Sequence, residues 1–182
     1  MKKIGIIIGT TRENRVSKSV ADWVFKVAKQ VANNNVEYSL IDLKDINLPL
    51  IDEPLPAAMA KGNYQHEHTK KWSKLIAGYD AFVIVTGEYN AGYPAVLKNA
   101  LDYLYAEWNN KPMALVGYGY PANGARSIEQ LRQVLNNLKV NTLHDSVLMS
   151  LGETLKETGF QTTEKLEQLL TQLLQNLAKE LA

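Results

Sequence analysis

The sequence predicts an open α/β fold in which a parallel sheet of five strands carries helices on both faces. Short apolar runs alternate along the chain with segments whose apolar residues recur every three or four positions, the spacing of one helix face. The apolar runs are continuous rather than alternating with polar residues, which is typical of parallel strands buried on both faces. The 182 residues suffice for one sizeable core, so we expect a single domain over residues 1–182.

The strands are expected where the apolar runs lie. Four runs are clear, and the fifth is the least continuous. In chain order they are Ile4–Ile8, Val36–Ile41, Ala81–Val85, Ala114–Val116 and the segment 140–148. The long irregular connection Leu48–Tyr64, with three prolines, is expected to line a pocket mouth or an interface.

Five helices are predicted between and after these strands, each from a stripe of apolar residues. The stripes are Val20, Val24, Val27, Ala28 and Val31; Trp72, Leu75 and Ile76; Val96, Leu97, Ala100, Leu101 and Leu104; Ile128, Leu131, Leu135 and Leu138; and Leu166, Leu169, Leu170, Leu173, Leu174, Leu177 and Leu181. Packing on the sheet explains the last stripe, and a coiled-coil partner helix is the alternative.

Composition limits the classes of function. The 20 basic and 19 acidic residues give a net charge of +1, which favours neither a nucleic acid nor a membrane surface as partner. The absence of cysteine excludes a disulfide scaffold, a thiol redox centre and a thiolate-held iron–sulfur cluster. Redox chemistry would therefore need a bound cofactor. With no signal-peptide pattern and no apolar stretch near ~20 residues, we expect a cytoplasmic protein.

The segment Gly9–Ser17 has the features of an anion site. It follows the first strand and precedes the first helix, so free backbone N–H groups and the positive end of the helix dipole converge there. The hydroxyls of Thr10, Thr11 and Ser17 can donate hydrogen bonds, and Arg12 and Arg15 add charge. The loop has neither Gly-x-Gly-x-x-Gly nor a P-loop lysine, and it suits a terminal phosphate monoester such as that of FMN. An ordinary strand-to-helix turn is the alternative.

Two further loops are expected at the same edge. In a sheet of order 2-1-3-4-5, the loops after strands one, three and four meet where such sheets bind ligands. The third and fourth strands are followed by segments 86–94 and 117–126, which are rich in glycine, tyrosine and asparagine. Glycine permits close backbone approach and tyrosine offers a flat face, so a planar ring with polar edges fits between them.

The residues of these loops resemble the NAD(P)H-dependent FMN reductases of flavodoxin-like fold, which include quinone, azo-dye and chromate reductases. The resemblance runs from Lys3 to about Leu155, and its most specific part is Glu88-Tyr89-Asn90 followed by Leu97-Lys98-Asn99-Ala100-Leu101-Asp102. It implies a flavodoxin-like, doubly wound sheet of order 2-1-3-4-5, bound FMN, and NADPH or NADH as co-substrate.

The resemblance also implies which residues bind the cofactor. Residues of the first loop would surround the phosphate, and the other two loops would lie along the ring. The expected set is Thr10, Thr11, Arg12, Val16, Ser17, Gly87, Glu88, Tyr89, Asn90, Tyr118 and Gly119. The chemistry is the cofactor's, so we name no catalytic side chain and no metal site. Gly87 replaces the family's usual proline and Asn123 a common glycine, departures that bear on ring affinity and redox potential.

The implied activity is hydride transfer from NAD(P)H through FMN to a small flat acceptor: a quinone, a flavin, an azo compound or an oxidised metal. A flavodoxin-type electron carrier is the alternative, although such carriers usually rely on an acidic surface that a charge of +1 does not supply. A redox-dependent sensor is a third reading, with no feature of its own in the sequence.

The family is commonly dimeric or tetrameric, so we expect a homo-oligomer. The residues Lys98, Asp102, Tyr105 and Trp108, with Tyr103 beside them, are predicted to form an interface outside the core stripe of the third helix. The cluster His66-Glu67-His68 is interpreted as a solvent-facing pair at a helix start, its two imidazoles pointing apart.

Overall fold

The fold is organised around one parallel sheet. The structure, a computed structural model, describes residues 1–32 and 35–181. The five strands lie in the order β2-β1-β3-β4-β5, and this confirms the predicted order. Their bounds are β1 Lys2–Ile8, β2 Val36–Asp42, β3 Ala81–Gly87, β4 Pro112–Gly119 and β5 Asn141–Ser150.

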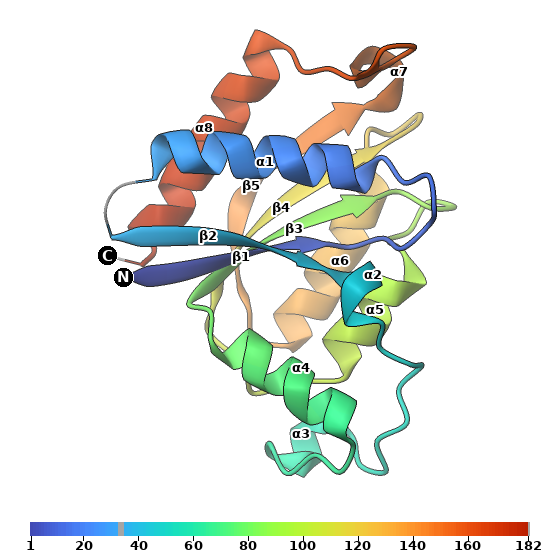
Figure 1. Cartoon of the computed structure of the whole chain (residues 1–182), viewed down its shortest axis with the longest axis vertical. Helices are drawn as coiled ribbons and strands as arrows, with labels where there is room; N and C mark the ends of the chain where they lie inside the picture. The colour runs from blue at the N-terminus through green and yellow to red at the C-terminus, as the bar shows by residue number, and fades with distance from the viewer. Residues whose placement is uncertain (33–34, 182) are drawn as a thin grey trace.

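Helices cover both faces of the sheet, as predicted. Helices α1 (Ser17–Val31) and α8 (Glu164–Lys179) pack on one face, and α4 (Glu67–Ala77), α5 (Ala95–Asp102) and α6 (Ala125–Asn137) pack on the other (Figure 1). Three short helices and a hairpin were not expected from the sequence. These are α2 (Leu43–Ile46), α3 (Ala57–Ala60), α7 (Leu151–Thr154) and the antiparallel pair β6 (Leu155–Lys156) and β7 (Gly159–Phe160).

The leucine stripe of α8 is part of the core. Leu170, Leu173, Leu174 and Leu177 are at most 2% exposed and belong to the cluster formed with α1 and the sheet. Leu169 lies on the outer side of the helix and is 47% exposed. Packing within the chain therefore explains the stripe.

The interface predicted on and after the third helix is wrong for two of its three aromatic residues. Tyr103 and Trp108 are fully buried, and the Trp108 indole donates a hydrogen bond to the carbonyl of Leu101 at 3.2 Å. Helix α5 ends at Asp102, and the chain then turns, so helical spacing no longer says where later side chains point. The Trp108 ring packs edge-on against Trp72 and Phe82.

The two histidines at the start of α4, His66 and His68, also differ from the expectation. His66 is the N-cap of α4 with extended backbone angles (φ −86°, ψ 141°), so it does not follow helical geometry. Its imidazole stacks on that of His68, with ring centres 5.3 Å apart and planes 6° from parallel. His68 Nε2 in turn lies 2.9 Å from Asp52 Oδ1. The pair is thus half-buried and stacked rather than opposed.

The long connection between α2 and α4 is tied to α5 by buried polar groups. The Asn99 side chain donates to the carbonyl of Pro49 at 2.7 Å and accepts from the N–H of Ile51 at 2.9 Å. The Tyr103 hydroxyl donates to the same Pro49 carbonyl at 3.2 Å. The backbone is fixed, yet this segment presents large apolar side chains to solvent: Leu50, Ile51, Leu55 and Met59.

Candidate functional site

The loops that follow β1, β3 and β4 meet at the carboxyl edge of the sheet, as predicted. The N–H of Gly9 donates to the carbonyl of Val85 at 2.8 Å, which ties the first loop to β3. The guanidinium of Arg12 lies over the Tyr89 ring, 5.5 Å from its centre. This edge is where open α/β sheets bind ligands.

The first loop presents hydroxyls and free N–H groups at the start of α1. Thr10 and Ser17 are fully buried, and their hydroxyl oxygens form a short hydrogen bond with each other. Val16, at the N-cap of α1, makes no side-chain hydrogen bond to the helix, and no acidic residue lies in the first turn. Thr11 and Arg12 are exposed. The loop therefore has the donors that an anionic group requires.

Arg15 has a different role from the one expected. Its side chain is only 9% exposed, and it donates to the carbonyl of Thr10 at 3.1 Å and forms a short ion pair with Asp42. The pairing of β1 with β2 places Ile8 opposite Asp42, so the carboxylate lies beside the first loop. The Arg15 side chain is therefore already paired, and it stabilises the loop. Arg12 is the arginine of this loop whose guanidinium remains available to a ligand.

Tyr118 lies beneath the first loop. It is 4% exposed, and its hydroxyl lies within hydrogen-bonding reach of Ser17 and Thr10. Burial raises the pKa of Tyr118 to about 12, further above neutral pH than the ordinary tyrosine value. The expected flat face is thus buried, and Tyr118 contributes a polar hydrogen-bonding group to the site instead.

The second loop forms a tight turn. Tyr89 and Gly92 exchange two backbone hydrogen bonds, at 2.7 and 3.0 Å. The two residues between them have positive φ, 49° for Asn90 and 64° for Ala91. This is the pattern of a two-residue hairpin turn, in which asparagine is common, whereas alanine costs about 1–2 kcal/mol in a left-handed conformation. Tyr89 is half-buried and Asn90 exposed.

Glu88 points away from this turn. Its side chain is 1% exposed and accepts hydrogen bonds from Arg126, at 2.6 Å from Nε and 3.2 Å from the backbone N–H. Arg126 is the second residue of α6, so the carboxylate also lies at the positive end of that helix dipole. The N–H of Glu88 donates to the carbonyl of Tyr118 at 2.9 Å. Glu88 therefore joins the loops after β3 and β4.

The glycines of these loops let the loops pack on one another. A Cβ at Gly119 would lie 2.8 Å from the Cβ of Glu88, and one at Gly87 would lie 3.0 Å from the Tyr118 hydroxyl. The space we expected a ligand to use beside these two glycines is filled by side chains of the chain itself. Asn123, where the family often has glycine, has a φ of 57°, which asparagine adopts more readily than most residues.

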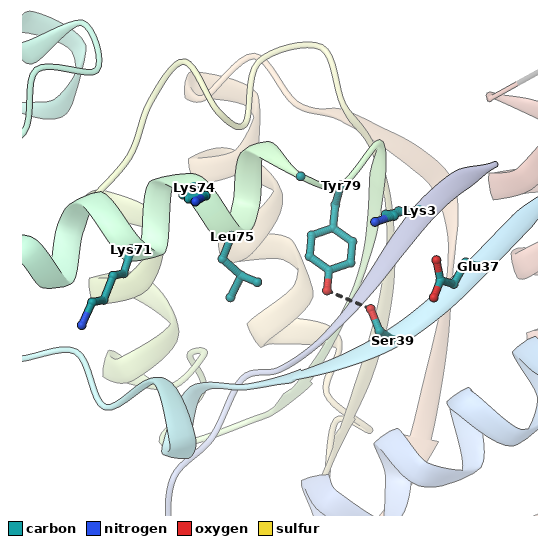
Figure 2. A pocket seen from close by; sticks show the side chains of 8 residues that line it. Lys3, Glu37, Ser39, Lys71, Lys74, Leu75 and Tyr79 are labelled. Carbon is teal, nitrogen blue, oxygen red and sulfur yellow. Dashed lines mark hydrogen bonds between the residues drawn. The ribbon is translucent and has the colours of Figure 1, made fainter.

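A cavity of about 500 Å³ lies elsewhere in the molecule, between α4 and the first two strands (Figure 2). The Tyr79 hydroxyl forms a hydrogen bond of 2.8 Å with the Ser39 hydroxyl across the cavity. Lys3, near the start of β1, is one of the residues that line it. Gly9 lies six positions after Lys3 along the extended chain, about 20 Å at ~3.3 Å per residue. This cavity is therefore separate from the carboxyl-edge site.

Within residues 1–32 and 35–181, none of the helices combines the length and the apolar character that a membrane span requires. Nor does this part of the chain hold a group of three or more His, Cys, Asp or Glu side chains that could bind a metal ion.

Comparison with known proteins identifies the family. The model of the NADPH-dependent FMN reductases matches residues 2–154. The NAD(P)H-dependent FMN reductase C4B3.06c of Schizosaccharomyces pombe is 45% identical over 138 residues, which are 76% of this chain and 68% of that protein. The chain belongs to the NADPH-dependent FMN reductase family. This confirms the resemblance and the enzyme class inferred from the sequence.

Solved structures show the fold of this reductase. FerB, a flavoenzyme NAD(P)H:(acceptor) oxidoreductase from Paracoccus denitrificans, superposes with a TM-score of 0.72 at 21% identity, covering 99% of each chain. Oxidised Flavodoxin 1 from Bacillus cereus superposes with a TM-score of 0.61 at 13% identity, covering 100% of each chain. These likenesses confirm the flavodoxin-like fold.

Sequence reasoning missed three residues that shape the site of the reductase. Asp42 is the partner of Arg15, and its position follows from the pairing of β1 with β2. Arg126 and Gln130 reach from α6 to the loop after β3. The signal for these two was their spacing of four, which places both on one face of a helix that begins at this edge.

Proposed function

We propose that the carboxyl-edge site of this reductase binds FMN and uses it to reduce a small flat acceptor with electrons from NADPH or NADH. Bound FMN supplies the redox chemistry, by accepting a hydride from the reduced nicotinamide and passing electrons on. The observation that carries the proposal is the pair of buried hydroxyls, Thr10 and Ser17, at a helix start without a side-chain cap, with Arg12 above the second loop.

The donor set of the first loop fits a phosphate monoester. The N–H groups at the start of α1, the hydroxyls of Thr10, Thr11 and Ser17, and the Arg12 guanidinium all donate hydrogen bonds. Val16 lies between them at the N-cap. Because Thr10 and Ser17 are fully buried, binding would require their hydroxyls to break the hydrogen bond between them and turn toward the phosphate oxygens.

The other two loops support a ring beside that phosphate. Tyr118 can donate a hydrogen bond, since a tyrosine is protonated at neutral pH and burial raises its pKa further, to about 12. Tyr89 and Asn90 are the accessible residues and would shape the acceptor pocket. Neighbouring groups fill the space around Gly87, Glu88 and Gly119. These residues therefore contribute to the site through their backbone and through the packing of the loops on one another.

A turnover assay distinguishes this function from that of a flavodoxin-type carrier. The FMN-loaded chain should oxidise NADPH with p-benzoquinone as acceptor and no other protein present, at a turnover on the order of 10 s⁻¹. The reason is that the site holds its flavin and leaves Tyr89 and Asn90 open to a second flat molecule. NADPH oxidation that begins only when a partner protein is added would favour the carrier instead.

A homo-oligomer, dimer or tetramer, is part of the proposal, through the connection Leu48–Tyr64, for which an interface is one of the two expected roles, rather than through the surface around Trp108. Leu50, Ile51, Leu55 and Met59 are 45–83% exposed and lie on one segment, whose start is fixed by the hydrogen bonds of Asn99 to Pro49 and Ile51. Large apolar side chains on a fixed backbone suit association with a second copy of the chain. The cytoplasmic location stays a prediction.

The apolar segment gives a direct test of association. The double variant Leu50→Glu, Met59→Glu should sediment as a monomer at micromolar concentration, where the native chain sediments as a dimer or larger, because two charges would have to be desolvated in the contact. The control is Leu169→Glu, at the exposed position on α8. A double variant that associates as well as the native chain would exclude this surface.

A further inference from the structure

A side chain of helix α6 contacts the turn formed by Tyr89, Asn90, Ala91 and Gly92. The side chain of Gln130, on α6, donates a hydrogen bond from Nε2 to the carbonyl of Ala91 at 2.8 Å. Gly92 makes this approach possible, since a Cβ there would lie 2.9 Å from Gln130 Oε1. Ala91 is the residue of the turn whose left-handed backbone its own side chain disfavours. The brace therefore lies at the strained point of the turn.

The position of helix α6, which carries Gln130, is fixed by contacts on two of its faces. Ile128 on its inner face packs against Gly117, where a Cβ would lie 2.7 Å from Ile128 Cγ1. On the outer face, Arg126 binds the Glu88 carboxylate one turn before Gln130. Two side chains four residues apart on one helix thus hold the loop after β3 at two points, its first residue Glu88 and the turn residue Ala91. Strained backbone persists only where its surroundings fix it, and such strain clusters at ligand sites.

We propose that Gln130 is a positioning residue of the flavin site, which keeps the turn at Asn90 and Ala91 in the conformation that receives the FMN ring. This inference rests on the proposed function. Gln130 need not touch the flavin. It acts through the carbonyl of Ala91, and it reduces the conformational freedom that the turn would otherwise lose on binding.

The test compares Gln130→Ala and Gln130→Glu with the native chain. The glutamate variant keeps the size of the side chain but removes the Nε2 donor. Each should weaken FMN binding about fivefold, the value of one neutral hydrogen bond, measured by quenching of flavin fluorescence. Glu129→Ala, at the exposed neighbouring position, should bind like the native chain. Gln130 variants that bind FMN as tightly as the native chain would overturn the inference.

A second readout needs no flavin. Exchange of the Gly92 amide hydrogen, which is bonded to the Tyr89 carbonyl, should become faster in both Gln130 variants while the thermal midpoint changes little. Unchanged exchange would show that the brace does not hold the turn. A native chain that takes up no FMN would instead overturn the proposed function, and the exchange rates would still decide whether the brace exists.

A rescue experiment separates positioning from a general loss of structure. Glycine adopts positive φ without penalty, so adding Ala91→Gly to Gln130→Ala removes the strain that the brace opposes. The double variant should bind FMN more tightly than Gln130→Ala alone. A double variant that binds FMN more weakly would contradict the role assigned to the strain at Ala91.

Discussion

Replacing Arg12 with alanine should weaken FMN binding about thirtyfold. A charge-assisted hydrogen bond to a phosphate contributes about 2 kcal/mol. Arg12 is the guanidinium of the first loop that is free to make one, because Arg15 is held by Thr10 and Asp42. Arg12 is exposed, so its loss should leave the free energy of unfolding nearly unchanged. Titration of the flavin-free variant with FMN measures the affinity.

Two further variants make this result specific. Lys18→Ala removes a nearby exposed cation that is already paired with Asp22 at 2.5 Å, and it should bind FMN like the native chain. Arg12→Lys keeps the charge but loses the forked geometry, so its affinity should fall between those of alanine and arginine. Equal losses in Arg12→Ala and Lys18→Ala would indicate a diffuse charge effect and argue against a phosphate contact at Arg12.

Replacing Arg126 with alanine should lower the free energy of unfolding by about 3 kcal/mol. It leaves the Glu88 carboxylate, 1% exposed, without its cation, and an uncompensated buried charge typically costs about 3–5 kcal/mol. The lower end applies because Arg126 is itself 48% exposed and the Glu88 carboxylate keeps the hydrogen bond from the backbone N–H of residue 126. Urea unfolding measures the change.

Whether the unpaired Glu88 carboxylate causes this loss of stability can be checked by removing its charge. Glu88→Gln combined with Arg126→Ala should recover part of the lost stability, because the amide is neutral and still accepts the backbone hydrogen bond. Glu129→Ala on the same helix should stay within about 0.5 kcal/mol of the native chain. A double variant less stable than Arg126→Ala alone would show that the carboxylate is not the source of the loss.

The fold was predictable because its signals are local. A run such as Ile4–Ile8 is too short and too continuous for a helix, and helical stripes separate it from the next run. What failed was the extension of a helical pattern past its end. The extended pattern places Tyr103 and Trp108 on an outer helix face, but α5 ends at Asp102, and the turn that follows directs both into the core.

The site was predictable at the level of its loops but not of its side-chain directions. Strand order brings the three loops together, and this follows from topology. Whether an arginine faces a ligand or braces the backbone depends on partners distant in sequence. Arg15 is 27 residues from Asp42, and Gln130 is 39 residues from Ala91. No periodicity within a single segment reports contacts of that kind.

The central claim, that this edge of the sheet holds FMN reducible by NAD(P)H, is tested most directly by visible absorption. The flavin-free chain is titrated with FMN, and NADPH is then added without oxygen. The account predicts a bound-flavin spectrum that bleaches at once with no other protein present, and an Arg12→Ala sample that binds FMN about thirtyfold more weakly. A native chain that takes up no FMN, or a bound flavin that stays oxidised with both NADPH and NADH, would contradict it.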